Sequence, residues 1–422
     1  MTGIILLAVY IGIFAVAAFI FTRVGVTKDG YTALKTVTFG DESAVRPNRA
    51  AGIISILTLF LLWGMFTGSS MIPSFLHAPA PFKGETSFEY TVEANGQTDT
   101  ATVAILVHGR EETSDAPVIE AGDGIAKNDS IKVAQYRSQL VAFDKNDDVK
   151  RADGAKVVAI NGTSVKPGDT VEIEGGSVTI SDKGTPNFAP ENGLQMEPLY
   201  LPSPEAVIDR TMKVLDEGFR GTSLLGHLGW SLFRVVAGFV CGAVVGIPLG
   251  YAMGLSNWFR GWFDPIVEFM RPVPPLALIP LVIIWAGIGE TGKIILLFLA
   301  ALWIMAIAAR SGVSGVNIAK VHAAYSLGAS KWQIMRYVII PNSLPEIFTG
   351  ARVAMGVCWG TVVAAELVAA EKGAGMMIMV ASKFQNTDIV ILGIILIGII
   401  GFGIDMLMRG AERVLVPWKG KG

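Results

Sequence analysis

One glycine-rich segment comes close to a phosphate-binding loop. Residues 287–293 are Gly-Ile-Gly-Glu-Thr-Gly-Lys, which fits the first seven positions of that motif. The eighth residue is Ile294, so the hydroxyl that would bind magnesium is missing. A phosphate-binding loop also follows a buried strand, whereas this segment lies between two long apolar stretches. We therefore interpret it as a tight turn, and any ATP hydrolysis requires a separate chain.

The other residue types that serve catalysis are scattered. The sequence contains four histidines, His77, His108, His227 and His322. Their spacing fits no metal-ligand motif, and no Gly-x-Ser-x-Gly motif occurs. The two cysteines, Cys241 and Cys358, lie inside apolar runs and fit small side chains packed between helices. The sequence therefore predicts no catalytic, metal or cofactor site.

Four residues in apolar stretches are candidates for polar chemistry inside a membrane. Charged side chains at membrane depth are costly, and they often mark a transport pathway. Glu268 and Arg271 are three residues apart, so a helix would bring them together. Glu366 lies two helical turns from Trp359 on a similar face. These residues either line a pathway or make structural ion pairs and hydrogen bonds, and the sequence leaves both interpretations open.

The composition indicates that lipid is the solvent for much of the chain. Of its 422 residues 51% are hydrophobic and 17% charged, against about 25% charged in a soluble domain. The net charge of −2 lacks the basic excess of a nucleic-acid-binding protein. Seven stretches approach the ~20 apolar residues that a bilayer-spanning helix needs. They are residues 3–21, 51–69, 228–254, 265–288, 293–309, 346–370 and 388–408.

A polar region separates the second stretch from the third. Residues 78–200 carry more acidic than basic side chains, and they contain short alternating runs typical of β-strands. The runs are 87–92, 101–107, 156–160 and 170–173. Turn sequences such as Asn161-Gly162 and Pro167-Gly168-Asp169 separate them. The sequence predicts a small soluble, mainly β domain inserted into a mainly α membrane protein.

Basic residues near the ends of the apolar stretches indicate the orientation. They gather in three places, as Arg23, Lys28, Lys35, Arg46 and Arg49, then Arg310, Lys320, Lys331 and Arg336, then Arg409, Arg413, Lys419 and Lys421. If seven spans alternate, all three groups lie in the cytoplasm, with the N-terminus and the β domain outside. Stretch 3–21 could instead be a cleaved signal sequence, although no basic residue precedes it.

Residues 320–345 are too polar to span a membrane and too regular for a flexible loop. A small apolar helical face ends at Leu327, and Gly328 should break that helix. Ser330 can cap a second helix, which Pro341 should end. Two short helices at an angle form a knob suited to another protein's groove. An ordinary interfacial hairpin fits the same pattern.

This segment resembles the coupling motif of binding-protein-dependent ABC importer permeases. The motif is matched by Ala323-Ala324-x-x-x-Gly328, nine further residues, and Val338-x-Ile340-Pro341, with His322 where many members have glutamate. Other segments are similar to the nitrate/sulfonate/taurine branch of that family, and most of all to its taurine-type permeases. They are residues 201–207, 271–281, 285–293, 344–352, 362–368 and 416–418, so the resemblance covers about 200–418.

The resemblance implies a type I ABC-importer-like transmembrane helical bundle in the bacterial inner membrane. The chain would be the channel-forming permease subunit of an importer for taurine or a related small sulfonate. Two permeases would form the pathway, two ATPase subunits would bind ATP and Mg, and an extracytoplasmic binding protein would deliver the substrate. The implied ATPase-coupling residues are His322, Ala323, Ala324, Gly328, Ala329, Ser330, Lys331 and Pro341.

The N-terminal half departs from the family pattern, in which one span leads directly to the Pro-Ser-Pro segment at 202–204. We therefore expect six parts. They are an extra N-terminal transmembrane helix with a cytoplasmic loop (1–50), the first core transmembrane helix (51–77), the extracytoplasmic β domain (78–200), an interfacial amphipathic segment (201–222), the permease domain with coupling helices at 320–341 (223–410) and a cytoplasmic tail (411–422).

Two other functions remain open. An importer of the same branch could carry nitrate, bicarbonate or another small anion. A protein of another class, a membrane-anchored scaffold, would use its β domain as the working part. The knob at 320–345 discriminates between the two classes, because an anchor has no need of paired cytoplasmic helices.

Overall fold

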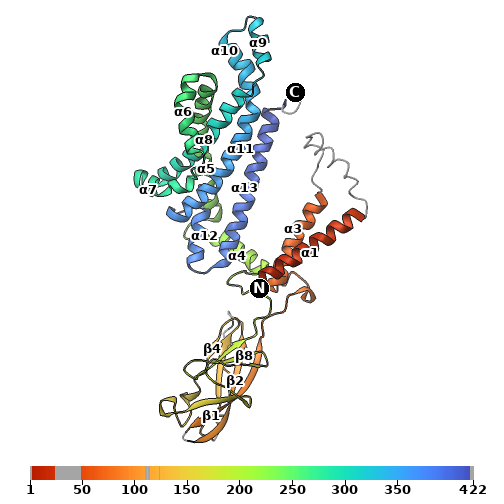
Figure 1. Ribbon diagram of the computed structural model, residues 1–422, viewed down its shortest axis with the longest axis vertical. Coiled ribbons are helices and arrows are strands. Elements are labelled where there is room, and N and C mark those ends of the chain that lie inside the picture. Colours follow the sequence, from red (N-terminus) through yellow and green to blue (C-terminus); the bar gives the residue numbers. More distant parts are fainter. Residues whose placement is uncertain are drawn as a thin grey trace. The chain divides into compact units, whose positions relative to one another are not determined.

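The computed structural model describes residues 2–23, 49–94, 96–109, 112, 115–122 and 124–418. The chain forms two compact units that divide after Glu205. Residues 24–48 and 419–422 lie outside the described residues, and they include several of the basic residues used to predict the orientation. Figure 1 labels the helices of the chain and four of its strands, β1, β2, β4 and β8.

The first unit begins with two apolar helices, α1 (Thr2–Arg23) and α3 (Arg49–Thr67), which contact each other. Hydrogen bonds fasten the segments that flank the β region to the end of α3. The backbone N–H of Met196 donates to the Phe66 carbonyl over 2.8 Å, and Trp63 Nε1 donates to the Pro202 carbonyl over 2.8 Å. These two bonds hold the segment after the β region beside α3, and the Ala78 N–H, which donates to the Met65 carbonyl over 3.0 Å, holds the segment before it.

Two sheets form the β region. Strands β1 (Gly84–Ala94), β2 (Gln97–His108), β3 (Asp129–Ala134), β5 (Lys156–Ile160) and β6 (Thr163–Ser164) pair in the order β3-β2-β1-β5-β6. Strands β4 (Gln139–Leu140), β7 (Thr170–Ile173), β8 (Gly176–Ile180) and β9 (Pro186–Pro190) pair in the order β4-β9-β8-β7. The β2–β3 pair is parallel and the others are antiparallel. Each predicted run lies in one of these strands.

Period-two alternation explains how the two sheets share a core. Phe88 and Tyr90 on β1 are buried, while Glu89 between them is exposed. Val178 and Phe188 from the other sheet join the same cluster of buried side chains. Asn161 and Gly162 both have positive φ, as a tight hairpin between β5 and β6 requires. The predicted mainly β region is confirmed.

The second unit is helical, and its bundle lies around α8 (Figure 1). Its helices are α4 (Pro204–Glu217, which begins just before the division), α5 (Leu224–Leu255), α6 (Asn257–Met270), α7 (Ile279–Ala286), α8 (Glu290–Ser314), α9 (Ile318–Ser326), α10 (Lys331–Ile334), α11 (Ile340–Ala369), α12 (Ala374–Lys383) and α13 (Thr387–Leu415). A row of glycines on α5 faces α8. A Cβ at Gly242 would lie 2.6 Å from the Ala301 Cβ, so only glycine permits this approach.

Helix α4 is amphipathic, as expected for segment 201–222. Val207 and Val214 are buried, whereas Ile208 and Met212 are exposed. Arg210 Nε lies 3.3 Å from Asp388 Oδ2 and links α4 to the first turn of α13. The exposed apolar stripe suits a membrane surface.

All seven predicted stretches coincide with helices, but not every one of these helices qualifies as a membrane span. Among the described residues, five helices are long and apolar enough to cross a membrane, and a sixth span results if α6 and α7 count as one. Residues 4–20 of α1 form a shorter apolar helix. The predicted span at 265–288 is bent by 92° between α6 and α7. Pro272, Pro274 and Pro275 explain this break, because proline lacks the backbone N–H that continues a helix.

A half-buried carboxylate gives the β region a pH dependence. The Tyr90 hydroxyl lies 2.9 Å from the Lys127 carbonyl and 3.1 Å from Asp129 Oδ2. Burial, with the negative charge of Asp147 nearby, raises the pKa of Asp129 to about 6. A carboxyl with a raised folded-state pKa binds more protons when folded. The free energy of unfolding should therefore fall as pH rises from about 4, the unfolded value, through 6.

We expect backbone amides of β1–β3 in the full chain to lose hydrogen-exchange protection between pH 4.5 and 6.5, after correction for intrinsic exchange rates. Asp129→Asn keeps an acceptor for Tyr90 and removes the titrating group, so its protection should be flatter across this range. Asp99 has a lowered pKa, chiefly because it accepts a hydrogen bond from the Ala126 N–H. Its protonation therefore changes only below the range from pH 4.5 to 6.5. An unchanged pH profile in Asp129→Asn would contradict the assignment.

Candidate coupling and pathway sites

Local sequence signals build the knob predicted at 320–345, whose two short helices are α9 and α10. The Asn317 side chain caps α9 by accepting from the Ala319 N–H over 2.9 Å. Gly328 follows α9 with a φ of +80°, a conformation that favours glycine. Ser330 and Gln333 form a reciprocal capping box that starts α10. The structure thus confirms the predicted break and cap.

The knob presents exposed apolar side chains, and side chains cap the N-termini of its two helices. Leu327 is 89% exposed, and Tyr325 and Trp332 are also largely exposed. The predicted coupling residues His322, Ala323, Gly328, Ser330 and Lys331 are exposed as well, whereas Ala324 and Ala329 are half-buried. Exposed aromatic and aliphatic side chains on capped helices are typical of a surface that binds another protein.

Pro341 does not end the second helix, which corrects that prediction. A π-helical turn at Met335–Ile339 connects α10 with α11, so helical structure continues from Lys331 to Val368. In that turn the Ile340 N–H donates to the Met335 carbonyl, five residues back. Pro341 occupies the first turn of α11, where a missing N–H is tolerated. The knob is therefore continuous with a membrane-spanning helix.

A buried ionic network surrounds Glu366 near the other end of that helix. Arg234 on α5 is 1% exposed and donates from Nη1 to Glu366 Oε1 over 2.5 Å. Its Nε and Nη2 donate to the two oxygens of Glu290, at the start of α8, over 2.5 and 2.7 Å. Lys293 Nζ lies 3.0 Å from Glu290 Oε1. One guanidinium therefore links α5, α8 and α11.

Polar groups at the start of α12 complete the network. The Ser231 hydroxyl lies 2.8 and 2.9 Å from the two Glu366 oxygens, and it accepts from the Ala374 N–H over 3.0 Å. The Gly375 N–H donates to Glu366 Oε2 over 3.0 Å. A Cβ at Gly373 would lie 2.3 Å from the Glu366 carboxyl carbon, so glycine allows the carboxylate to approach the backbone.

Sequence reasoning identified Glu366 but missed the partners of its carboxylate. Arg234 is the eleventh residue of a 32-residue apolar helix, and a charge inside such a helix was the signal that could have found it. Glu290 was interpreted only as part of a tight turn. The network holds Glu366 as a structural ion pair, one of the two interpretations left open.

The other intramembrane candidates do not join this network. Trp359 is buried and donates from Nε1 to the Ile397 carbonyl on α13 over 3.1 Å. Glu268 lies 3.8 Å from Arg271, the predicted pair, but its nearer partner is Arg310 on α8 at 3.0 Å. Arg271 is 67% exposed at its side chain. These contacts fasten α13 to α11 and α6 to α8.

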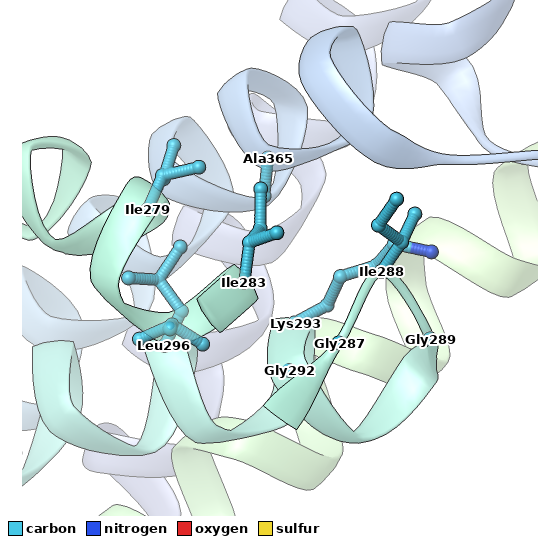
Figure 2. A pocket seen from close by; sticks show the side chains of 10 residues that line it. Ile279, Ile283, Gly287, Ile288, Gly289, Gly292, Lys293, Leu296 and Ala365 are labelled. Atoms are coloured by element: carbon cyan, nitrogen blue, oxygen red, sulfur yellow. The ribbon is translucent and has the colours of Figure 1, made fainter. Parts of the chain in front are cut away.

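The glycine-rich segment 287–293 forms the turn between α7 and α8. Gly287 has a φ of +75°, and α8 begins at Glu290, after a helix rather than a strand. Figure 2 shows the small pocket at this turn, lined mainly by apolar side chains such as Ile279, Ile283 and Leu296. Lys293 is largely buried, and its ammonium bonds Glu290. The segment is a tight turn, as predicted.

Comparison with known proteins identifies relatives of the second unit. The family model described as "Binding-protein-dependent transport system inner membrane component" matches residues 242–416. The taurine transport system permease protein TauC of Escherichia coli (strain K12) is 46% identical over 227 residues, which are 54% of this chain and 82% of that protein. The putative aliphatic sulfonates transport permease protein SsuC of the same strain is 39% identical, over 52% of this chain and 81% of that protein.

Among solved structures, a crystal structure of an amino acid ABC transporter aligns with 49% of this chain and 96% of its own chain. The TM-score is 0.41 and the sequence identity 17%. The family match begins within α5, so the β region lies outside it.

The network generates a stability prediction. Arg234→Ala leaves two carboxylates without their shared partner, and removal of one member of a buried pair costs about 3–5 kcal/mol. We expect a large fall in the thermal unfolding temperature of the purified chain in detergent. Arg260→Ala is the matched control, because Arg260 pairs with Asp264 at 3.8 Å and is exposed, and such pairs contribute about 0–1 kcal/mol. Equal unfolding temperatures for both variants would refute the structural role of Arg234.

Proposed function

Because this chain belongs to the family of binding-protein-dependent transport system inner membrane components, we propose that it forms the substrate pathway of an importer for taurine or a related small sulfonate. It is the permease subunit of a binding-protein-dependent ABC importer of the taurine/sulfonate-type branch, and a multi-pass membrane protein. Permease components are not themselves catalytic and carry no cofactor. ATP is bound by a partner ATPase.

The capped knob is the observation that carries the proposed coupling. Its exposed surface around Gly328 is continuous, through the π-helical turn, with the helix that ends near the buried network. From Lys331 to Glu366 this helix rises roughly 50 Å at 1.5 Å per residue. A displacement of the knob by an ATPase subunit would thus reach Glu366 and its contacts with α5, α8 and α12.

Alternating access follows from this arrangement in a homodimer of the permease. ATP binding would favour the state in which two ATPase subunits hold the two knobs together, and hydrolysis would release them. The extracytoplasmic binding protein would select and deliver the substrate. A tight binding site in the permease is then unnecessary, because the pathway needs only a low barrier in each state.

The sulfonate assignment rests on the relatives. TauC and SsuC carry taurine and aliphatic sulfonates in their names, and their similarity extends over most of their length. Uptake of radiolabelled taurine, competed by other alkanesulfonates, nitrate or bicarbonate, tests this part of the proposal. If nitrate competed and the alkanesulfonates did not, the sulfonate assignment would be wrong and the substrate would be another small anion.

The coupling assignment predicts that Gly328→Asp stops uptake while the protein stays in the membrane. A side chain at this positive φ strains the turn by about 1 kcal/mol or more, and the carboxylate alters the exposed surface. The chain leaves open space around the Gly328 Cβ position, so the permease itself should remain folded. The measurement is co-purification of the ATPase with the permease, together with uptake. Normal uptake in Gly328→Asp would contradict docking at the knob.

The proposed orientation predicts opposite labelling of two exposed serines. After replacement of Cys241 and Cys358 by alanine, Ser130→Cys in β3 should react with a membrane-impermeant thiol reagent on intact spheroplasts. Ser326→Cys in α9 should react only after lysis. Labelling of position 326 in sealed cells would overturn the cytoplasmic assignment of the knob.

A further inference from the structure

Two prolines weaken the helix that carries the knob. Pro341 and Pro345 lie four residues apart in α11, directly after the π-helical turn at Met335–Ile339. In an α-helix the N–H of residue 345 would donate to the carbonyl of residue 341, but Pro345 has no N–H. The Pro345 ring also crowds that carbonyl. Prolines and π-turns are the usual causes of helix kinks, so this stretch is a natural hinge.

A side chain from the C-terminal segment supplies the missing donor. Trp418 Nε1 donates to the Pro341 carbonyl over 3.1 Å, although the two residues are 77 positions apart. The segment is anchored next to this bond, since Val416 is 2% exposed and its N–H donates to the Glu412 carbonyl over 2.8 Å. Trp418 itself is 44% exposed.

Other contacts fasten α11 to its neighbours near the hinge, and they involve groups other than the Pro341 carbonyl. Arg352 Nε, about two turns beyond Pro345, lies 3.2 Å from Asp405 Oδ1 on α13. The Ser343 hydroxyl lies 2.5 Å from the Tyr251 hydroxyl and donates to the Ile340 carbonyl over 2.9 Å. These bonds hold α11 to α5 and α13. The Trp418 bond acts on the hinge itself.

We propose that Trp418 is a positioning residue for coupling, which locks the Pro341–Pro345 hinge so that the knob and α11 move as one lever. This inference rests on the proposed function. Without the indole N–H, the Pro341 carbonyl would turn towards solvent and α11 would bend there. Displacement of the knob would then be absorbed at the hinge before it reached Glu366.

One variant removes the hydrogen bond to the Pro341 carbonyl, and a second variant supplies another donor to the same carbonyl. Trp418→Phe keeps an aromatic ring and removes the donor. Pro345→Ala adds a backbone N–H that can reach the Pro341 carbonyl within the helix. The double variant Trp418→Phe/Pro345→Ala should therefore recover the stiff helix without the tryptophan. Pro248→Ala, at a proline inside α5, is the matched control, because it adds an N–H away from the hinge.

The readout is the distance distribution between spin labels at Ser326 in α9 and Thr349 in α11, on either side of the hinge. The full chain is reconstituted in nanodiscs with Cys241 and Cys358 replaced by alanine. We expect one narrow distribution in the parent, and a roughly fivefold larger bent population in Trp418→Phe, about the weight of one net hydrogen bond. Pro345→Ala should restore the narrow distribution and Pro248→Ala should not.

Two results would overturn the proposal. They are a distribution in Trp418→Phe as narrow as in the parent, and a failure of Pro345→Ala to restore it. Taurine transported per ATP hydrolysed, in liposomes with the ATPase and the binding protein, should fall in Trp418→Phe and recover in the double variant. If the parent chain neither binds an ATPase nor transports taurine, the proposed function fails, while the spin-label distances still decide whether Trp418 locks the hinge.

Discussion

The second unit depends on a single guanidinium held between two carboxylates. Arg234 is buried, and it binds Glu366 and Glu290 at 2.5–2.7 Å from three different nitrogens. A charge at that depth is tolerated only because its donors are used by carboxylates and by the Lys372 carbonyl. The positions of α5, α8, α11 and α12 follow from this requirement. A shift of any one of them would leave a buried charge uncompensated.

The network and the knob lie towards opposite ends of one helical stretch, and this links local chemistry to function. Short polar groups fix the end at Glu366, where Ser231 and the N–H groups of Ala374 and Gly375 surround the carboxylate. Caps and a positive-φ glycine shape the other end. Between them the helix is interrupted by a π-helical turn and two prolines. The stiffness of this helix therefore depends on contacts with neighbouring elements as well as on its own backbone hydrogen bonds.

The sequence predicted those elements whose signals are local. Period-two alternation identified the main strands, and Ser330 and Gly328 identified the cap and the break in the knob. Non-local features were missed. The partner of Glu366 lies 132 residues away, and the donor to Pro341 lies 77 residues away. No periodicity or spacing encodes such pairs, because they form only when helices distant in sequence pack together.

Two wrong predictions each came from one local rule applied alone. Hydropathy alone gave one span at 265–288, although a run of prolines bends it by 92°. Proline rules alone ended the knob helix at Pro341, although the preceding π-helical turn places that residue where no N–H is needed. At 265–288 the missing N–H groups of the prolines outweighed the apolar pattern, whereas at Pro341 the helix continued through the proline.

The glycine row on α5 restricts how this protein can change over generations. At Gly238, Gly242, Gly246 and Gly250 an added Cβ would meet atoms of α8 at 2.3–2.6 Å, and several of those atoms are backbone that cannot rotate away. Every amino acid that a single-base change of a glycine codon can introduce carries a Cβ. The face of α5 that meets α8 is thus closed to gradual substitution, and sequence drift in this bundle must be confined to its other faces.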